Sequence, residues 1–142
     1  MDMQGPLHRY RCRVIYGDTD SGGVVYYANY LRYFEAARTE FMRERALSYK
    51  EFEQQGCIMP VVECHVRYKA SARYDDLLLI ETSLSEVKSR TCRFTYRVIR
   101  ENDGKMLAHG FTVHAVVDLN GRLTKFPDGL LDALREQSAE AP

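Results

Sequence analysis

The sequence predicts an α+β fold in which one long helix lies against a mainly antiparallel, five-stranded sheet. Residues 29–47 have a strongly apolar pattern at helical spacing, and five extended runs occupy 8–16, 62–69, 77–87, 92–98 and 107–119. The late runs are joined by short connections such as "ENDG" at 101–104, which is typical of hairpins. With 142 residues the chain is expected to form a single domain, 1–142, with flexible ends at about 1–7 and 137–142.

The first strand is predicted from the alternation of apolar and basic residues over 8–16. The two expected faces carry Tyr10, Cys12, Val14 and Tyr16, and Arg9, Arg11 and Arg13. In the helix that follows, Asn29 is suited to cap the start. Its apolar stripe consists of Tyr30, Phe34, Ala37 and Phe41, widened by Leu31, Ala36 and Met42, which leaves Arg32, Glu35, Arg38, Arg43 and Glu44 for the polar side. So wide an apolar surface predicts a helix wrapped by other structure.

The rest of the chain is predicted from caps and from period-two patterns. A short helix at 48–55 should begin at Ser48 and be closed by Gly56. An apolar face is expected on three of the later runs. It consists of Val62, Cys64, Val66 and Tyr68 in 62–69; of Cys92, Phe94, Tyr96 and Val98 in 92–98; and of Leu107, Phe111, Val113, Ala115, Val117 and Leu119 in 107–119. The segment "FPDGLLDALREQ" predicts a short terminal helix.

Composition excludes several classes of function. The chain is 45% hydrophobic and has a formal net charge of +0, so it can build a core and has no excess of positive charge for a nucleic-acid partner. The N-terminal residues lack a signal-peptide pattern, and no apolar run approaches the roughly 20 residues that span a bilayer. We therefore expect a soluble, cytoplasmic protein.

No metal site is expected from the cysteines and histidines. Zinc ligands usually come in closely spaced pairs, and none of the four cysteines forms a C-x-x-C pair. Cys64 and His65 are adjacent, so on a strand they point to opposite faces. The cysteines are therefore expected to be reduced structural thiols.

The segment "YGDTDSGGVVYYANYLRYFEAARTEFMR", which begins at Tyr16, resembles the signature of the hotdog-fold thioesterases. The similarity is to the 4-hydroxybenzoyl-CoA and Tol-Pal-associated acyl-CoA thioesterases, and "YKASARYDDLLLIET" at 68–82 resembles a second family segment. The resemblance implies a hotdog fold, with one long central helix wrapped by a curved sheet. It also implies a homo-oligomer, a dimer or dimer of dimers, in which edge strands pair and the active sites lie at the subunit interface.

The resemblance assigns catalysis to Asp20, which directly precedes the variable pair and the glycine, and the oxyanion-donor role to the backbone N–H of Tyr27. An aspartate is ionised at neutral pH and can attack a thioester carbonyl or activate water, and a helix start offers free N–H donors. Gly23, with its neighbouring glycine, lets the backbone turn tightly near a ligand. Asp18 is expected to hold the turn.

The candidates for substrate binding are aromatic and basic. Tyr26 and Tyr30 could line an acyl pocket or belong to the core. Arg67, Arg73 and Arg90 are candidates for the coenzyme A phosphates. Coenzyme A is part of the substrate, and no cofactor is expected. Tyr27 stands where the Tol-Pal-associated enzymes have histidine, so steps that depend on that histidine do not carry over.

Two other functions stay open at this point. One is a hotdog module that binds acyl-CoA without hydrolysis, and the other is an acyl dehydratase. The dehydratase is disfavoured because none of the four histidines lies in the loop or on the long helix. The sequence does not identify the acyl group, nor does it decide between direct attack by Asp20 and base-assisted attack by water.

Overall fold

A computed structural model describes residues 3, 5–46 and 48–140 of the chain. The sheet contains β1 (His8–Arg13), β2 (Val61–Tyr68), β3 (Leu77–Val87), β4 (Thr91–Arg100) and β5 (Lys105–Ala115). The strand order is β1-β3-β4-β5-β2, and every neighbouring pair is antiparallel. The helices are α1 (Asn29–Arg45), α2 (Tyr49–Gln54) and α3 (Asp128–Glu136), and a 3-10 turn spans Tyr16–Asp18. The predicted α+β class and antiparallel sheet are confirmed.

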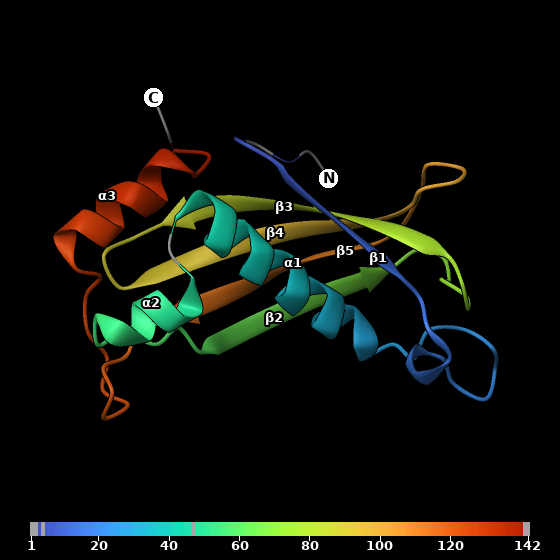
Figure 1. Ribbon diagram of the computed structural model, residues 1–142, viewed down its shortest axis with the longest axis horizontal. Coiled ribbons are helices and arrows are strands. Elements are labelled where there is room, and N and C mark those ends of the chain that lie inside the picture. The colour runs from blue at the N-terminus through green and yellow to red at the C-terminus, as the bar shows by residue number, and fades with distance from the viewer. Residues whose placement is uncertain (1–2, 4, 47, 141–142) are drawn as a thin grey trace.

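The long helix α1 lies across one face of the sheet (Figure 1). Its apolar stripe forms the core with strands β3 and β4: Phe34 stacks on Tyr96 with ring centroids 4.2 Å apart, and Phe41 meets Phe94 edge to face at 5.7 Å. Ala37 is fully buried between these contacts. Burial of one such aromatic side chain contributes about 1.5–3 kcal/mol, so the stripe accounts for the position of the helix.

The ends of the first two elements differ from the prediction. β1 ends at Arg13 instead of continuing to 16, because Tyr16 enters the 3-10 turn and stacks in solvent on Tyr74, with ring centroids 3.8 Å apart. α1 is preceded by Ala28 as its cap residue, and the Asn29 amide instead donates to the carbonyl of Asp18 at 2.8 Å. The helix ends at Arg45; the predicted end at Leu47 lies outside the described residues.

Two predicted faces are wrong. Arg38 was placed on the polar side of the helix, but only 9% of it is exposed. On β5 the buried side chains include Ala108, Thr112 and His114, whereas Phe111 and Val113 are half-buried on the other face. The pairing of β4 with β5 shifts by one residue between Val98 and Ile99, and a shift of one residue reverses the faces of a strand.

Several local predictions are confirmed. The Ser48 hydroxyl caps α2 by accepting the N–H of Glu51, and Gly56 follows with a left-handed φ of 82°.

The predicted flexible end, 137–142, is in part ordered: Ser138 is buried, and Ala139 donates its N–H to the carbonyl of Leu84 in β3. Residues 141 and 142 lie outside the described residues.

Strand β2 is an edge strand with an unusual exposure. It pairs only with β5, and apart from half-buried Val66 its residues are exposed, including Val61 at 44% and Val62 at 59%. Exposed apolar edges of this kind favour pairing with another strand.

Candidate active site

The loop between β1 and α1 is closed by its own backbone. The N–H of Asp20 donates to the carbonyl of Val24 at 2.8 Å, and the N–H of Gly23 donates back to Asp20 at 3.0 Å. Gly23 has a φ of 80°, a left-handed conformation that favours glycine. The N–H of Tyr26 then donates to the carbonyl of Asp18 at 2.8 Å, which turns the chain into α1.

A second segment, residues 72–76, supports this loop from behind. The N–H of Val25 donates to the carbonyl of Ala72. At the end of β1, the N–H of Val14 donates to the carbonyl of Asp76, and the N–H of Asp75 donates to the carbonyl of Val14. The two sequence motifs, far apart in the chain, therefore lie side by side.

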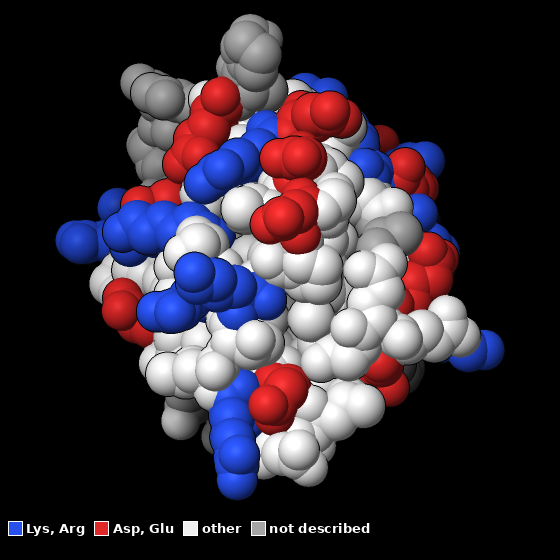
Figure 2. Space-filling view, turned by 90° about the vertical axis from the view of Figure 1, so that its left-hand side faces the viewer, with Lys and Arg blue, Asp and Glu red and all other residues white. Residues whose placement is uncertain are grey.

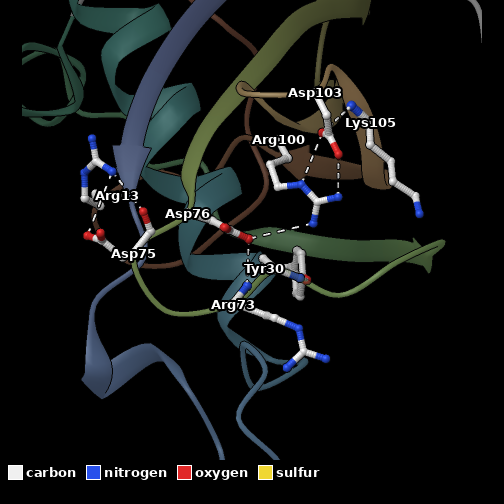
Figure 3. A network of polar contacts seen from close by, with 9 residues as sticks. Arg13, Tyr30, Arg73, Asp75, Asp76, Arg100, Asp103 and Lys105 are labelled. Carbon is white, nitrogen blue, oxygen red and sulfur yellow. Dashed lines mark hydrogen bonds and ion pairs between the residues drawn. The ribbon is translucent and has the colours of Figure 1, made fainter.

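Side chains hold the supporting segment in shape (Figure 3). The Asp76 carboxylate accepts the N–H of Arg73 at 2.9 Å and lies 3.9 Å from the guanidinium of Arg100, which is itself paired with Asp103. Asp75 has a φ of 71°, and its carbonyl accepts a hydrogen bond from Arg13 at 2.8 Å. These aspartates shape the backbone that carries the loop.

Asp20 presents an exposed carboxylate at the mouth of the loop. Its Oδ1 accepts the N–H of Gly22 at 2.8 Å and faces the N–H of Val24 at 3.5 Å. A side chain at Gly22 would begin 3.2 Å from the same oxygen, which explains the small residue there. The backbone therefore orients one carboxylate oxygen, while the other, Oδ2, receives no hydrogen bond from any described residue.

The backbone N–H of Tyr27 lies just before the start of α1. None of the described residues accepts a hydrogen bond from it, whereas the Tyr27 carbonyl accepts the Tyr68 hydroxyl at 2.9 Å. Free N–H groups and the positive end of the helix dipole at this position stabilise negative charge. Tyr68 was not assigned a role in the sequence analysis, although it opens the second motif.

Asp20, Tyr27, Tyr30 and Tyr68 line one cavity of about 330 Å³. Tyr30 is buried, and its hydroxyl accepts the N–H of Ala72 at 3.2 Å; burial raises the pKa of Tyr30, so it stays protonated at neutral pH. Tyr26 is 45% exposed and lies beside this cavity, and its neighbour Tyr27 raises its pKa. The cavity thus combines a carboxylate, a free backbone donor and aromatic walls.

Asp18 has a different environment from Asp20. Only 4% of it is exposed, and its carboxylate accepts hydrogen bonds from the Ile15 N–H at 3.2 Å, the Tyr33 hydroxyl at 3.0 Å and Arg32 at 3.1 Å. Burial and the hydrogen bond to Asp18 raise the pKa of Tyr33 strongly. Asp18 adjoins a separate cavity, of about 450 Å³, between β1 and α1.

The three arginine candidates are not gathered at one place. Arg73 lies beside the loop: a Cβ built on Gly23 would be 3.9 Å from its Nη1. Arg67 is on the edge strand β2, opposite His109 of β5. Arg90 is in the turn between β3 and β4, at the opposite end of the molecule from the loop (Figure 1). Basic side chains gather on one side of that end (Figure 2).

Two further findings concern metals and membranes. Within residues 3, 5–46 and 48–140, no group of three or more His, Cys, Asp or Glu side chains is arranged to hold a metal ion. No helix among the described residues is long and apolar enough to span a membrane.

Comparison with known proteins identifies the family. The model of the thioesterase-like superfamily matches residues 14–134. The acyl-CoA thioesterase YbgC of Haemophilus influenzae is 43% identical over 108 residues, which cover 75% of this chain and 78% of that protein.

Solved structures agree with this assignment. A protein of Thermus thermophilus matches with a TM-score of 0.87 at 36% identity, covering 93% of this chain and 98% of that chain. The DHNA-CoA thioesterase of Staphylococcus aureus matches with a TM-score of 0.85 at 26% identity, covering 92% and 89% of the two chains. The chain therefore belongs to the thioesterase-like superfamily and is a thioester hydrolase with the hotdog fold.

Proposed function

We propose that this enzyme hydrolyses acyl-CoA thioesters with a small acyl group, short-chain aliphatic or aromatic, to the free acid and coenzyme A. The observation that carries the proposal is that Asp20 and Tyr27, whose backbone N–H has no partner among the described residues, line the same cavity near the start of α1. The relative named acyl-CoA thioesterase YbgC supports coenzyme A as the thiol part of the substrate. A volume of about 330 Å³ suits a small acyl group.

In the proposed reaction the thioester carbonyl oxygen accepts the N–H of Tyr27, which stabilises the negative charge that develops on that oxygen. One such donor contributes about 3 kcal/mol to the transition state in other enzymes. The dipole of α1 acts in the same direction. Gly23 contributes the turn that brings Asp20 to this point.

Asp20 acts in one of two ways. As a nucleophile, its Oδ2 attacks the carbonyl carbon, the C–S bond breaks, coenzyme A leaves as a thiolate that takes a proton, and water then hydrolyses the Asp20 anhydride. As a general base, it takes a proton from water while the water oxygen attacks the carbonyl, and the proton passes to the leaving thiolate. A single turnover in ¹⁸O-labelled water distinguishes the routes, because only the nucleophilic route can leave the label in Asp20.

We infer that the enzyme works as a homo-oligomer, at least a dimer, joined through β2. The exposed Val61 and Val62 on an edge strand support this arrangement. It also gives Arg90 a role: at the far end of its own chain, it can serve only the cavity of another copy, whereas Arg73 can serve its own. Tyr26, Tyr30 and Arg67 complete the proposed substrate-binding set.

A panel of benzoyl, phenylacetyl, short and long aliphatic acyl-CoA esters tests the proposal through thiol release. We expect the wild-type enzyme to hydrolyse at least one of these esters and Asp20→Asn to lose most of that activity. Hydrolysis should continue after treatment with a chelator, because the proposal involves no metal or organic cofactor. Binding without thiol release for every ester would instead identify a binding module. The dehydratase alternative finds little support, because none of the residues that line the cavity is a histidine. The cytoplasmic location stays a prediction.

A further inference from the structure

Arg38 is a buried cation in the middle of α1. It is 9% exposed, and among the residues that the structure describes no carboxylate lies within ion-pair distance of its guanidinium. A charge that is removed from water without a counter-ion is strongly unfavourable. Glu35, one helical turn earlier, acts on this charge without forming an ion pair, so a direct ion pair is left for a further anion.

The surroundings of Arg38 leave room for such an anion. Arg38 lines two cavities, of about 280 and 210 Å³, and Glu35 is the other residue that they share. Tyr49 belongs to the second cavity, and its buried hydroxyl lies beside the Arg38 guanidinium. Tyr96, whose hydroxyl bonds Thr112 at 2.6 Å, also adjoins the guanidinium. The groups around Arg38 are thus the Tyr49 and Tyr96 hydroxyls, the Glu35 carboxylate and open space.

These cavities continue the line of the active site. The active-site cavity is bounded by Tyr27 of the helix start and Tyr68 of β2, and the next cavity by Leu31 and Cys64. Leu31 lies one helical turn after Tyr27, and Cys64 lies four residues before Tyr68 on the same face of the strand. The cavities therefore follow one another between α1 and β2, from Tyr27 toward Arg38.

We propose that Arg38 binds a terminal carboxylate of the acyl group, so that the enzyme also accepts longer acyl-CoA esters that end in a carboxylate. The inference rests on the proposed function, because it places the thioester carbonyl at Tyr27. Leu31 and Val61 supply apolar walls for the methylene chain, and the Arg38 guanidinium forms a charge-assisted pair with the carboxylate at its end. The Tyr49 hydroxyl donates a second hydrogen bond to that carboxylate.

The length of the acyl group follows from the helix. Arg38 follows Tyr27 by eleven positions, which corresponds to about 16 Å at about 1.5 Å per residue. Long helical side chains point back toward the helix start, so this distance is an upper limit. An extended chain advances about 1.2 Å per bond, so a chain of up to about 13 bonds spans the gap.

The experiment compares two esters of equal length, decanedioyl-CoA with a free carboxylate and decanoyl-CoA with a methyl end. For the wild-type enzyme we expect kcat/KM to be about ten- to a hundredfold higher for decanedioyl-CoA, the range typical of a hydrogen bond to a charged group. Arg38→Met should remove this preference without reducing hydrolysis of decanoyl-CoA. Its melting temperature should not fall, because an unpaired buried charge has been replaced by an apolar side chain.

Glu35→Gln is the matched control, since Glu35 lines both cavities and is the acid that could reach Arg38 from its own chain. It should keep the preference for decanedioyl-CoA. Equal rates for the two esters in the wild type, or a preference that survives Arg38→Met, would overturn the inference. If Arg38→Met does not fold, Arg38→Gln takes its place.

A binding measurement separates this inference from the proposed function. Calorimetry on the Asp20→Asn enzyme, with and without Arg38→Met, compares the affinities for the two esters without any turnover. If the wild type releases no thiol from any ester, the proposed function is wrong, and the calorimetry alone then tests whether Arg38 binds the terminal carboxylate. Equal affinities of the two esters for the Asp20→Asn enzyme would overturn the role proposed for Arg38.

Discussion

Asp18 and Asp20 are two residues apart, yet the same substitution should have opposite consequences at the two positions. Asp20→Asn is expected to remove most hydrolysis and leave stability nearly unchanged, whereas Asp18→Asn is expected to lower stability more than it lowers the rate. The contrast follows from exposure: Asp18 is 4% exposed and fully hydrogen-bonded, whereas Asp20 is exposed.

The stability effect can be worked out for Asp18. Its Oδ2 accepts both the Ile15 N–H and the Tyr33 hydroxyl, and its Oδ1 accepts Arg32. An asparagine amide must place its NH2 group at one of these positions, where it meets a donor. A buried donor left without an acceptor costs about 1–3 kcal/mol, and the pair with exposed Arg32 adds little. We expect a fall in melting temperature of about 5–10 °C.

Asparagine at position 20 keeps an acceptor for the Gly22 N–H, so its effect on stability should stay within about 0.5 kcal/mol. The rate should fall by about 10²–10⁴ if Asp20 is a general base, and by more if it is the nucleophile.

Both variants should be measured by thiol release at saturating acyl-CoA and by thermal unfolding, with circular dichroism to show that they fold. The loss of a general base typically lowers the rate by about 10²–10⁴. A folded Asp20→Asn enzyme whose rate stays within about threefold of the wild-type rate would therefore refute the assignment of Asp20. An inactive Asp18→Asn beside an active Asp20→Asn would move the chemistry to the first aspartate.

Three further outcomes are expected. Burial lowers the pKa of His114 to about 4 from its ordinary value near 6.5. Between these pH values the folded state binds fewer protons than the unfolded state, so about 3 kcal/mol of stability should be lost as pH falls through this window. The free energy of urea unfolding, measured from pH 7 to 4, should show this loss, and His114→Gln should reduce it. Val62→Asp, on the exposed edge, should shift the oligomer toward monomer in sedimentation experiments, whereas an unchanged assembly would exclude pairing through β2. Tyr68→Phe, which removes the hydrogen bond to the Tyr27 carbonyl, should lower kcat about two- to tenfold with little change in melting temperature, and an unaltered kcat would show that this bond does not position the loop.

Much of the fold could be predicted because its signals are local. The helical stripe of Phe34 and Phe41, the Ser48 cap and the turn before Gly104 depend on residues that are close in sequence, and each is found as expected. The buried face of β5 could not be predicted, because it is set by a register shift against β4 that no pattern within β5 records. Arg38 was misplaced for a similar reason: its burial comes from the approach of other elements.

The candidate site likewise combines residues that the sequence predicts with contacts that it does not. The resemblance placed Asp20, Tyr27 and Gly23 in one loop, and the structure adds that Asp20 and Tyr27 share a cavity. The hydrogen bond from Tyr68 to Tyr27 and the main-chain bond from Val14 to Asp76 join segments more than 40 residues apart, and a single sequence does not reveal them.

The loop that carries Asp20 is fastened to residues 72–76 chiefly by main-chain hydrogen bonds. Such bonds use no side-chain atoms, so exposed positions of either segment can change while the carboxylate and the Tyr27 N–H stay in place, except where Gly22, Gly23 and Asp76 shape the turn. Residues proposed to bind the substrate, such as Arg73 and Arg38, can therefore change without altering the main-chain frame that holds Asp20.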